Sequence, residues 1–143
     1  MFNRVKRIYL AGPYTHEDPK VMEERYNILT QIATNLVSLG YLVFSPITHS
    51  HPINLKLNIF EFAHWRIYDL VMIAEWADEI WVAPIRGWED STGVKGELEF
   101  ANKISIGVRI IPMLLEPFDK WNLSALGKPI VEVKELPDYY EFM

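Results

Sequence analysis

The sequence predicts an α/β fold built on a mostly parallel sheet of about five strands. Short apolar runs, typical of buried strands, stand at residues 7–11, 41–44 and 79–83. Longer segments with apolar residues at helical spacing lie between them, at residues 21–39 and 59–77. Strands and helices that alternate at this spacing favour parallel strands joined by right-handed crossovers.

The first strand and the first helix have clear ends. The apolar run at residues 7–11 stops at Gly12 and Pro13, which together signal a turn. Within residues 21–39 the apolar positions recur every three or four residues, and Gly40 marks the C-terminal end of this helix. A buried strand that ends in a turn and leads to a helix is therefore predicted at the start of the chain.

The second strand leads into residues 45–52, which we interpret as a loop that carries His49 and His51. This loop follows the carboxyl end of a strand, the edge where open α/β sheets bind ligands. With His64, the two histidines suggest a metal site, but no Cys or H-E-x-x-H pattern accompanies them. We therefore predict ligand contacts for His49 and His51, and no metal or other cofactor.

The helix at residues 59–77 is apolar nearly all round. One face carries Phe62, Trp65, Ile73 and Trp76, and the opposite face carries Phe60, Ile67, Val71 and Ala74. A helix that is apolar on two sides is buried on two sides. Since the chain is short, we expect a second copy to cover one face, which predicts a homodimer or a higher homo-oligomer. Asp69 falls among the aromatic residues of the first face.

The remaining elements follow in order along one domain. After the strand at residues 79–83 we predict a helix to about Lys103, a strand at 109–115, a short edge strand at 129–133 and an aromatic tail at 136–143. Pro112 limits the hydrogen bonding of the 109–115 strand. No repeat, low-complexity segment or linker divides the sequence, so residues 1–143 are predicted to form a single domain.

Composition excludes several classes of protein. Half of the 143 residues are hydrophobic, which disfavours disorder, and a net charge of −5 without a basic stripe disfavours nucleic-acid binding. The absence of cysteine excludes disulfides and thiolate metal sites. No apolar run approaches the length of a signal peptide core or the about 20 residues of a membrane span. We expect a soluble, cytoplasmic protein that has no membrane partner.

The strand at residues 79–83 runs through a loop into a helix that we expect to begin at Ser91 or Thr92. Serine and threonine are favoured N-caps, and the first N–H groups of a helix have no partners within it. Such an N-terminus is a ready site for an anion such as phosphate. Gly93 in its first turn lets the backbone approach a ligand closely.

Glu97 is the residue of this helix that we predict to carry chemistry. At about 100° per residue, Glu97 lies within or beside the apolar stripe formed by Val94 and Leu98, whereas Glu99 points away from it. A carboxylate directed inward is costly unless it has a partner or a functional role. Its position one turn from the expected anion site favours the functional role over that of a solvated surface glutamate.

Three pieces of the chain in this order resemble the nucleoside 2-deoxyribosyltransferase superfamily. They are Ile8–Tyr14, Asp69 ahead of residues 77–82, and residues 90–101. The match spans about residues 8–101. The Ser-x-Gly-Val-x-x-Glu form of Ser91–Glu97 is most similar to the branch that hydrolyses deoxynucleoside 5′-monophosphates, and the chain also resembles small phage and bacterial proteins of unassigned function.

The resemblance implies a flavodoxin-like (Rossmann-like) three-layer sandwich that forms oligomers with shared active sites. It also implies that Glu97 is the nucleophile and that Ser91, with the helix start, holds a phosphate. Gly12, Pro13 and Tyr14 then belong to the substrate site, with Tyr14 lining the sugar pocket. The His49–His51 loop and the insertion 88–90 depart from the family pattern and leave the substrate base open.

A second acid must help the base to leave, and Asp69 and Asp90 are the candidates. Asp69 could instead pair with another residue of its helix. Asp90 could instead be a turn residue or an N-cap. Trp88 and Trp65 are large enough to stack on a base, although most tryptophans serve the core or an interface. For His49 and His51, contacts to a sugar hydroxyl or a phosphate fit this site.

The sequence thus predicts an enzyme that cleaves the N-glycosidic bond of a (deoxy)nucleoside or its 5′-monophosphate. A carboxylate can attack the anomeric carbon of such a substrate and form a covalent glycosyl intermediate. A deoxyribosyltransferase differs only in that a second base, and not water, resolves this intermediate. A non-catalytic nucleotide or nucleotide-sugar sensor on the same fold is the alternative of another class.

Overall fold

The structure, a computed structural model, describes residues 5–58, 62–111 and 134–135. Its sheet has the strand order β2-β1-β3-β4-β5. The strands are β1 (Arg7–Ala11), β2 (Leu42–Phe44), β3 (Glu79–Val82), β4 (Gly107–Ile110) and β5 (Lys134–Glu135). The first four are parallel, and the two-residue β5 pairs antiparallel with β4. The predicted mostly parallel sheet is confirmed, with four strands in its parallel part.

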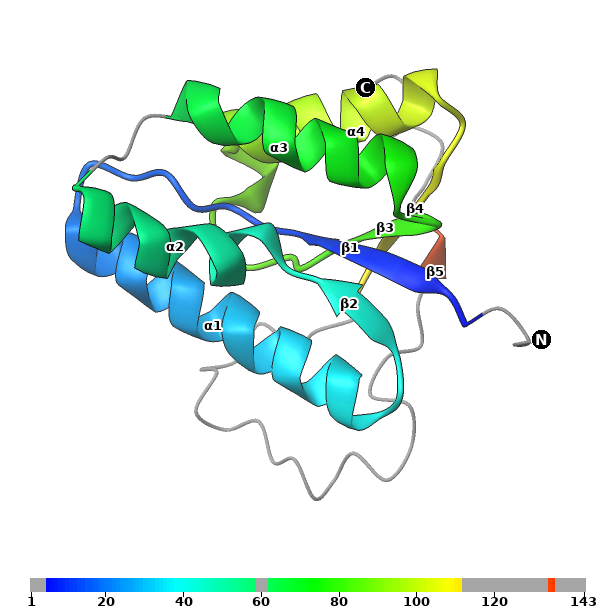
Figure 1. Cartoon of the computed structure of the whole chain (residues 1–143), viewed down its shortest axis with the longest axis horizontal. Helices are drawn as coiled ribbons and strands as arrows, with labels where there is room; N and C mark the ends of the chain where they lie inside the picture. Colours follow the sequence, from blue (N-terminus) through cyan, green and yellow to red (C-terminus); the bar gives the residue numbers. More distant parts are fainter. Residues whose placement is uncertain (1–4, 59–61, 112–133, 136–143) are drawn as a thin grey trace.

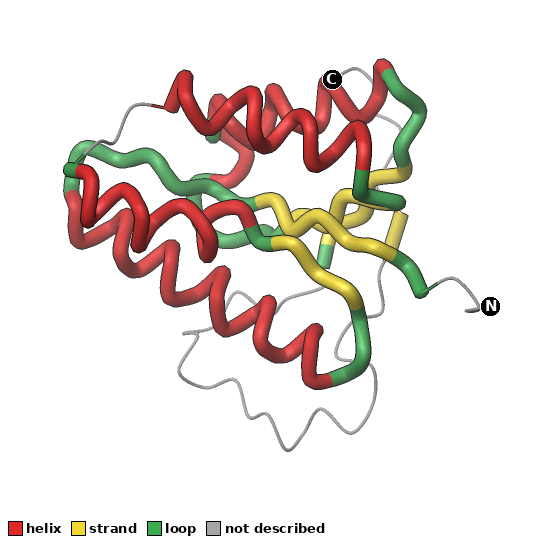
Figure 2. Tube along the Cα trace, in the orientation of Figure 1, coloured by secondary structure: helices red, strands yellow, loops and turns green. Residues whose placement is uncertain are grey.

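Two helical layers cover this sheet, so the predicted three-layer sandwich is also confirmed. Helices α1 (Pro19–Ser38) and α2 (Pro46–Leu57) lie on one face, and α3 (Phe62–Glu75) and α4 (Thr92–Lys103) lie on the other (Figures 1 and 2). The single 3-10 turn among the described elements, η1 (Trp88–Asp90), precedes α4.

The two-residue alternation of β1 divides the core between the layers. Ile8 and Leu10 pack toward α1, whereas Tyr9 and Ala11 pack toward α3 and α4. All four side chains are fully buried. This alternation matters for function because it directs the hydroxyl of Tyr9, the polar one of the four, toward α4.

The interpretation of residues 45–52 as a loop is wrong, because Pro46–Leu57 forms helix α2. Pro46 occupies the first turn, where a missing N–H has no cost, and Ser45 precedes it as the N-cap. Pro52 lies inside the helix. Packing against α1, including a 2.8 Å hydrogen bond between the hydroxyls of Thr30 and Thr48, stabilises α2 despite this second proline.

Several predicted boundaries shift. The helix expected at 59–77 is α3, which ends at Glu75, and the strand expected at 109–115 is β4, which begins at Gly107. Residues 59–61 and 112–115 of these two predictions lie outside the described residues. The predicted edge strand at 129–133 and the tail at 136–143 lie outside the described residues. Within the described ranges, every helix is too short or too polar to cross a lipid bilayer.

Candidate active site

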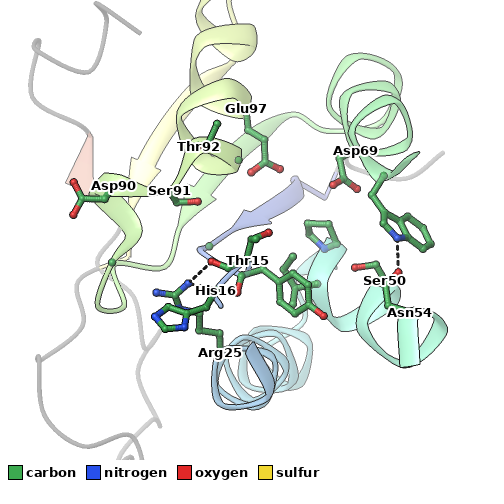
Figure 3. Close-up of a pocket in the computed structure, with 17 residues that line it drawn as sticks. Thr15, His16, Arg25, Ser50, Asn54, Asp69, Asp90, Ser91, Thr92 and Glu97 are labelled. Carbon is green, nitrogen blue, oxygen red and sulfur yellow. Dashed lines mark hydrogen bonds between the residues drawn. The ribbon is translucent and has the colours of Figure 1, made fainter. Parts of the chain in front are cut away.

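A cavity of about 550 Å³ opens at the carboxyl ends of the parallel strands, the edge predicted to bind ligands. This volume suits a ligand of nucleotide size. The loop after β1 and helices α1 to α4 all contribute to its walls (Figure 3). The lining residues that carry the argument below are Tyr14, Arg25, Asn54, Trp65, Asp69, Ser91 and Glu97.

Glu97 lies in this cavity and is held by the centre of the sheet. It is 9% exposed, and the hydroxyl of Tyr9 donates a hydrogen bond to its Oε2. The apolar stripe of α4 packs on the sheet, with Val94, Leu98 and Ala101 buried, and Glu97 shares this buried side as predicted. Glu99 is exposed, which confirms the difference in orientation expected from the helical period.

Asp69 reaches the same cavity from α3. It is 8% exposed and lies on the same side of the close-up as Ser50 and Asn54, with its carboxylate near that of Glu97 (Figure 3). Asp90 also lines the cavity, but it is exposed and lies at the opposite end (Figure 3). The structure therefore brings Asp69, and not Asp90, together with Glu97.

Burial sets the protonation of the two carboxyls. It raises the pKa of Glu97 to about 8, with the Tyr9 hydrogen bond opposing the rise and the charge of Asp69 adding to it. Burial likewise raises the pKa of Asp69 to about 7. The pKa of Tyr9 is raised by burial and by the two neighbouring acids. The hydroxyl of Tyr9 is thus a permanent donor, and both carboxyls exchange protons near neutral pH.

The start of α4 forms one end of the cavity. Ser91 is the N-cap, as predicted, and its Oγ accepts a 3.2 Å hydrogen bond from the N–H of Val94. Ser91, Thr92 and Gly93 all line the cavity. The partial positive charge of a helix N-terminus therefore faces this space.

The guanidinium of Arg25 lies at the same end (Figure 3). Its Nη1 donates to the carbonyl oxygens of Tyr14, at 3.4 Å, and Thr15, at 3.1 Å. Gly87, which has a φ of +94°, makes room for it, because a Cβ at this position would lie 2.6 Å from Nη2. Arg25 and Gly87 were not predicted as site residues, and only the fold brings them to the site.

The other predicted site residues fall into two groups. Gly12, Tyr14 and Gly93 line the cavity, whereas Pro13, His49, His51 and Trp88 are not part of its lining. Trp88 packs against the core between the sheet and α4, and His49 is exposed beside Phe44, Trp65 and Tyr68. In the described ranges no three His, Cys, Asp or Glu side chains gather in a group able to hold a metal ion.

Comparison with protein families matches residues 6–113 to the family described as "Domain of unknown function (DUF1937)". The chain belongs to this family. No curated protein sequence matches it. Among solved structures, the DUF1937 chain is similar to a 2-deoxyribosyltransferase from the psychrotolerant bacterium Bacillus psychrosaccharolyticus. The TM-score is 0.50 at 22% sequence identity, over 92% of this chain and 99% of the other. At this identity the likeness bears on the fold, and it agrees with the predicted flavodoxin-like architecture.

Tyr9 is the site residue of this DUF1937 domain that sequence reasoning missed although a signal was present. Within residues 8–11 of β1 it is the polar member of an otherwise aliphatic run, and Glu97 is the inward carboxylate of α4. Strand alternation and helical period together place both side chains between the sheet and the same helical layer. Ser50 and Asn54 carried no such signal, because residues 45–52 were interpreted as a loop and no helix was predicted at residue 54.

The raised pKa values predict that the protein loses stability as pH rises. Since the fold favours the neutral carboxyls, their contribution is complete below the ordinary pKa values of 3.8 for Asp69 and 4.5 for Glu97. It is lost as pH rises through about 7 and about 8, respectively. Urea unfolding between pH 4 and 9 should therefore show a decline that Glu97→Gln and Asp69→Asn each make shallower. An unchanged slope in both variants, matching that of Glu99→Gln, would contradict this assignment.

Proposed function

We propose that this chain cleaves the N-glycosidic bond of a (deoxy)nucleoside or its 5′-monophosphate, with Glu97 as the nucleophile. The observation that carries the proposal is a pair of buried carboxyls, Glu97 and Asp69, in one cavity of nucleotide size. N-glycosidic cleavage has an oxocarbenium-like transition state, which a carboxylate beside the anomeric carbon stabilises. The hydroxyl of Tyr9 fixes Oε2 of Glu97, which leaves the other oxygen to attack.

The reaction proceeds in two steps. Ionised Glu97 attacks the anomeric carbon, the carbon–nitrogen bond breaks, and the base leaves with the bonding electron pair and takes the proton of Asp69. The product is a glycosyl ester of Glu97. Water then attacks the same carbon, gives its proton to the Asp69 carboxylate, and releases the sugar and the Glu97 carboxylate.

The environment of Asp69 supports its role as the acid in preference to Asp90. Its pKa of about 7, raised by burial, keeps a proton available at neutral pH. It also lies beside Glu97, whereas Asp90 lies exposed at the other end of the cavity (Figure 3). The productive form has Glu97 ionised and Asp69 protonated. Because the pKa of Glu97 is the higher of the two, this is the minor form of the free site at neutral pH. The positive charge that develops on the sugar favours it by stabilising ionised Glu97.

The Ser91 end of the cavity supports a 5′-phosphate on the substrate. The N-terminus of α4 and the guanidinium of Arg25 both line this end. Among the described residues, Arg25 makes hydrogen bonds to carbonyl oxygens and forms no salt bridge within 4.0 Å. A phosphate here would gain charge-assisted hydrogen bonds from two independent elements.

The transferase alternative shares the first step and differs in the acceptor. A nucleotide or nucleotide-sugar sensor would use the same cavity without turnover. Incubation with a panel of nucleosides and monophosphates, followed by chromatography for free base, separates the three functions. Base released into buffer supports the hydrolase, release that requires an added acceptor base supports the transferase, and a raised melting temperature without release supports the sensor.

Glu97→Gln should abolish base release while folding and ligand binding survive. The amide keeps the size and the helix propensity of the side chain but removes the attacking charge, so turnover should fall by about three orders of magnitude or more. Glu99→Gln, exposed two residues along the same helix, is the matched control and should retain wild-type turnover. Mass spectrometry of quenched wild-type enzyme should find a sugar adduct on the Glu97 peptide if the ester accumulates. Near-wild-type turnover of Glu97→Gln would refute the mechanism.

Ser91→Ala should weaken binding of a monophosphate and leave binding of the matching nucleoside nearly unchanged. Loss of one charge-assisted hydrogen bond corresponds to about 1.5–3 kcal/mol, or roughly ten- to a hundredfold in Kd. Calorimetric titration of both ligands measures the difference. Because Ser91 also caps α4, stability should fall by about 0.5–2 kcal/mol in either case. Equal losses of affinity for the two ligands would make Ser91 a helix cap alone.

We also propose that the protein is a homodimer or a higher homo-oligomer that assembles through the outer face of α3. Ile67 is 71% exposed and Val71 is 50% exposed on this face. Val71→Asp should therefore dissociate the oligomer without unfolding the chain, since a charge buried in an interface costs several kcal/mol. Light scattering at micromolar concentration measures the change. Val37→Asp is the matched control, because Val37 is 56% exposed and lies on α1, on the other side of the sheet. A monomeric wild type would contradict the proposal.

A further inference from the structure

Helix α2 carries two buried polar side chains for which the reaction above has no use. His51 and Asn54 are 4% and 3% exposed and lie one turn apart. Neither acts on the reacting atoms, and His51 is not part of the cavity lining. Buried polar groups destabilise a fold unless they are hydrogen-bonded, so their partners indicate what they do.

His51 holds the side chain of Tyr14. Its ring stacks on Tyr26 of α1, with 4.4 Å between the centroids, and its Nδ1 lies 2.6 Å from the hydroxyl of Tyr14. Burial lowers the pKa of His51, with the charge of Glu23 opposing, so the imidazole is neutral near pH 7. With the imidazole proton on Nε2, Nδ1 accepts and the hydroxyl of Tyr14 donates.

Asn54 holds the side chain of Trp65 and also contacts Tyr14. The indole Nε1 of Trp65 donates to Oδ1 of Asn54 at 2.6 Å, a bond drawn in Figure 3. Burial raises the pKa of the Tyr14 phenol, and the nearby side chain of Asn54 opposes this rise. The side chains of Trp65, Asn54, Tyr14 and His51 therefore form one continuous chain of interactions across three segments of the fold.

The rings of Tyr14 and Trp65 both line the cavity, and Asn54 lies at the end of the cavity near Asp69. Asp69 is the acid that protonates the leaving base in the proposed reaction, and the anion-binding groups Ser91 and Arg25 lie away from it (Figure 3). The base must therefore occupy the Asp69 end. Aromatic side chains there offer a flat leaving group favourable stacking and edge contacts.

We propose that His51 and Asn54 are positioning residues that fix Tyr14 and Trp65 as the walls of a slot for the planar base of the substrate. This inference rests on the proposed function for the identity of the ligand. The walls come from the loop after β1 and from α3, whereas both anchors belong to α2. The separation of the walls is thus set by α2, and a change in either anchor should alter base recognition without touching the carboxyls.

The test measures binding of free bases, which needs no catalysis. Adenine, hypoxanthine, cytosine and thymine are titrated calorimetrically into the full-length protein, with 2-deoxyribose 5-phosphate as a ligand that lacks a base. His51→Phe keeps a ring on Tyr26 but removes the acceptor, and it should weaken binding of the best base roughly three- to tenfold. His51→Gln keeps an acceptor and should stay within about twofold of wild type. The exposed α2 substitution Lys56→Gln is the control variant.

A double-mutant cycle shows whether His51 acts through Tyr14. Tyr14→Phe should cause a loss of base affinity similar to that of His51→Phe, and the double variant should lose no more than either alone. All variants should bind 2-deoxyribose 5-phosphate as the wild type does. Far-ultraviolet circular dichroism and urea unfolding confirm that each variant is folded before it is titrated.

Several outcomes would overturn the inference. They are equal losses for bases and for 2-deoxyribose 5-phosphate, a greater loss in His51→Gln than in His51→Phe, additive effects in the cycle, or no base binding by the wild type. If the coupled loss of base binding appears but no nucleoside or monophosphate releases base, the slot stands and the glycosidase proposal fails. The same wild type and variants therefore distinguish a failure of the slot inference from a failure of the glycosidase proposal.

Discussion

The hydrogen bond from Tyr9 to Glu97 is the interaction on which the site depends. It joins the central part of the sheet to α4 through the fully buried Tyr9 and the 9% exposed Glu97. An inward-facing glutamate without this donor would leave a buried polar group unpaired, which costs about 1–3 kcal/mol. The bond and the apolar stripe of α4 fix the same rotation of the helix about its axis. As a consequence, Ser91, Thr92 and Gly93 at the start of α4 face the cavity.

The two carboxyls have no ion-pair partner among the described residues, although Arg66 lines a small neighbouring pocket with them. Two buried acids without a counter-ion favour their neutral forms, as their raised pKa values reflect. Such a pair reduces stability at neutral pH, which is a typical feature of sites where function and stability conflict. A sugar that develops positive charge between them would supply the missing counter-ion.

Periodic patterns in the sequence were sufficient for the parallel sheet and for the inward orientation of Glu97, because strand alternation and helical spacing are local properties. The three-layer arrangement was predicted from the family resemblance instead. Helix α2 was not predicted from the sequence because Pro46 and Pro52 are typical of loops. Ser45-Pro46 is nevertheless a favourable helix start. Its stability depends on packing against α1 and on side-chain partners distant in sequence. The contacts of His51 and Asn54, and the position of Arg25, follow from tertiary structure that no local pattern encodes.

Helix α2 also bears on whether hydrolysis or transfer follows the first step of the proposed mechanism. Once the base has left, water and a second base compete for the glycosyl ester on Glu97. A second base must first occupy the slot between Tyr14 and Trp65, whereas water needs no such binding. In the proposed mechanism, the affinity of that slot for a free base would therefore be one determinant of the partition between the two reactions. His51 and Asn54 contact Tyr14 and Trp65, so under the two proposals the choice of reaction would depend on α2 as well as on the carboxyls that both reactions share.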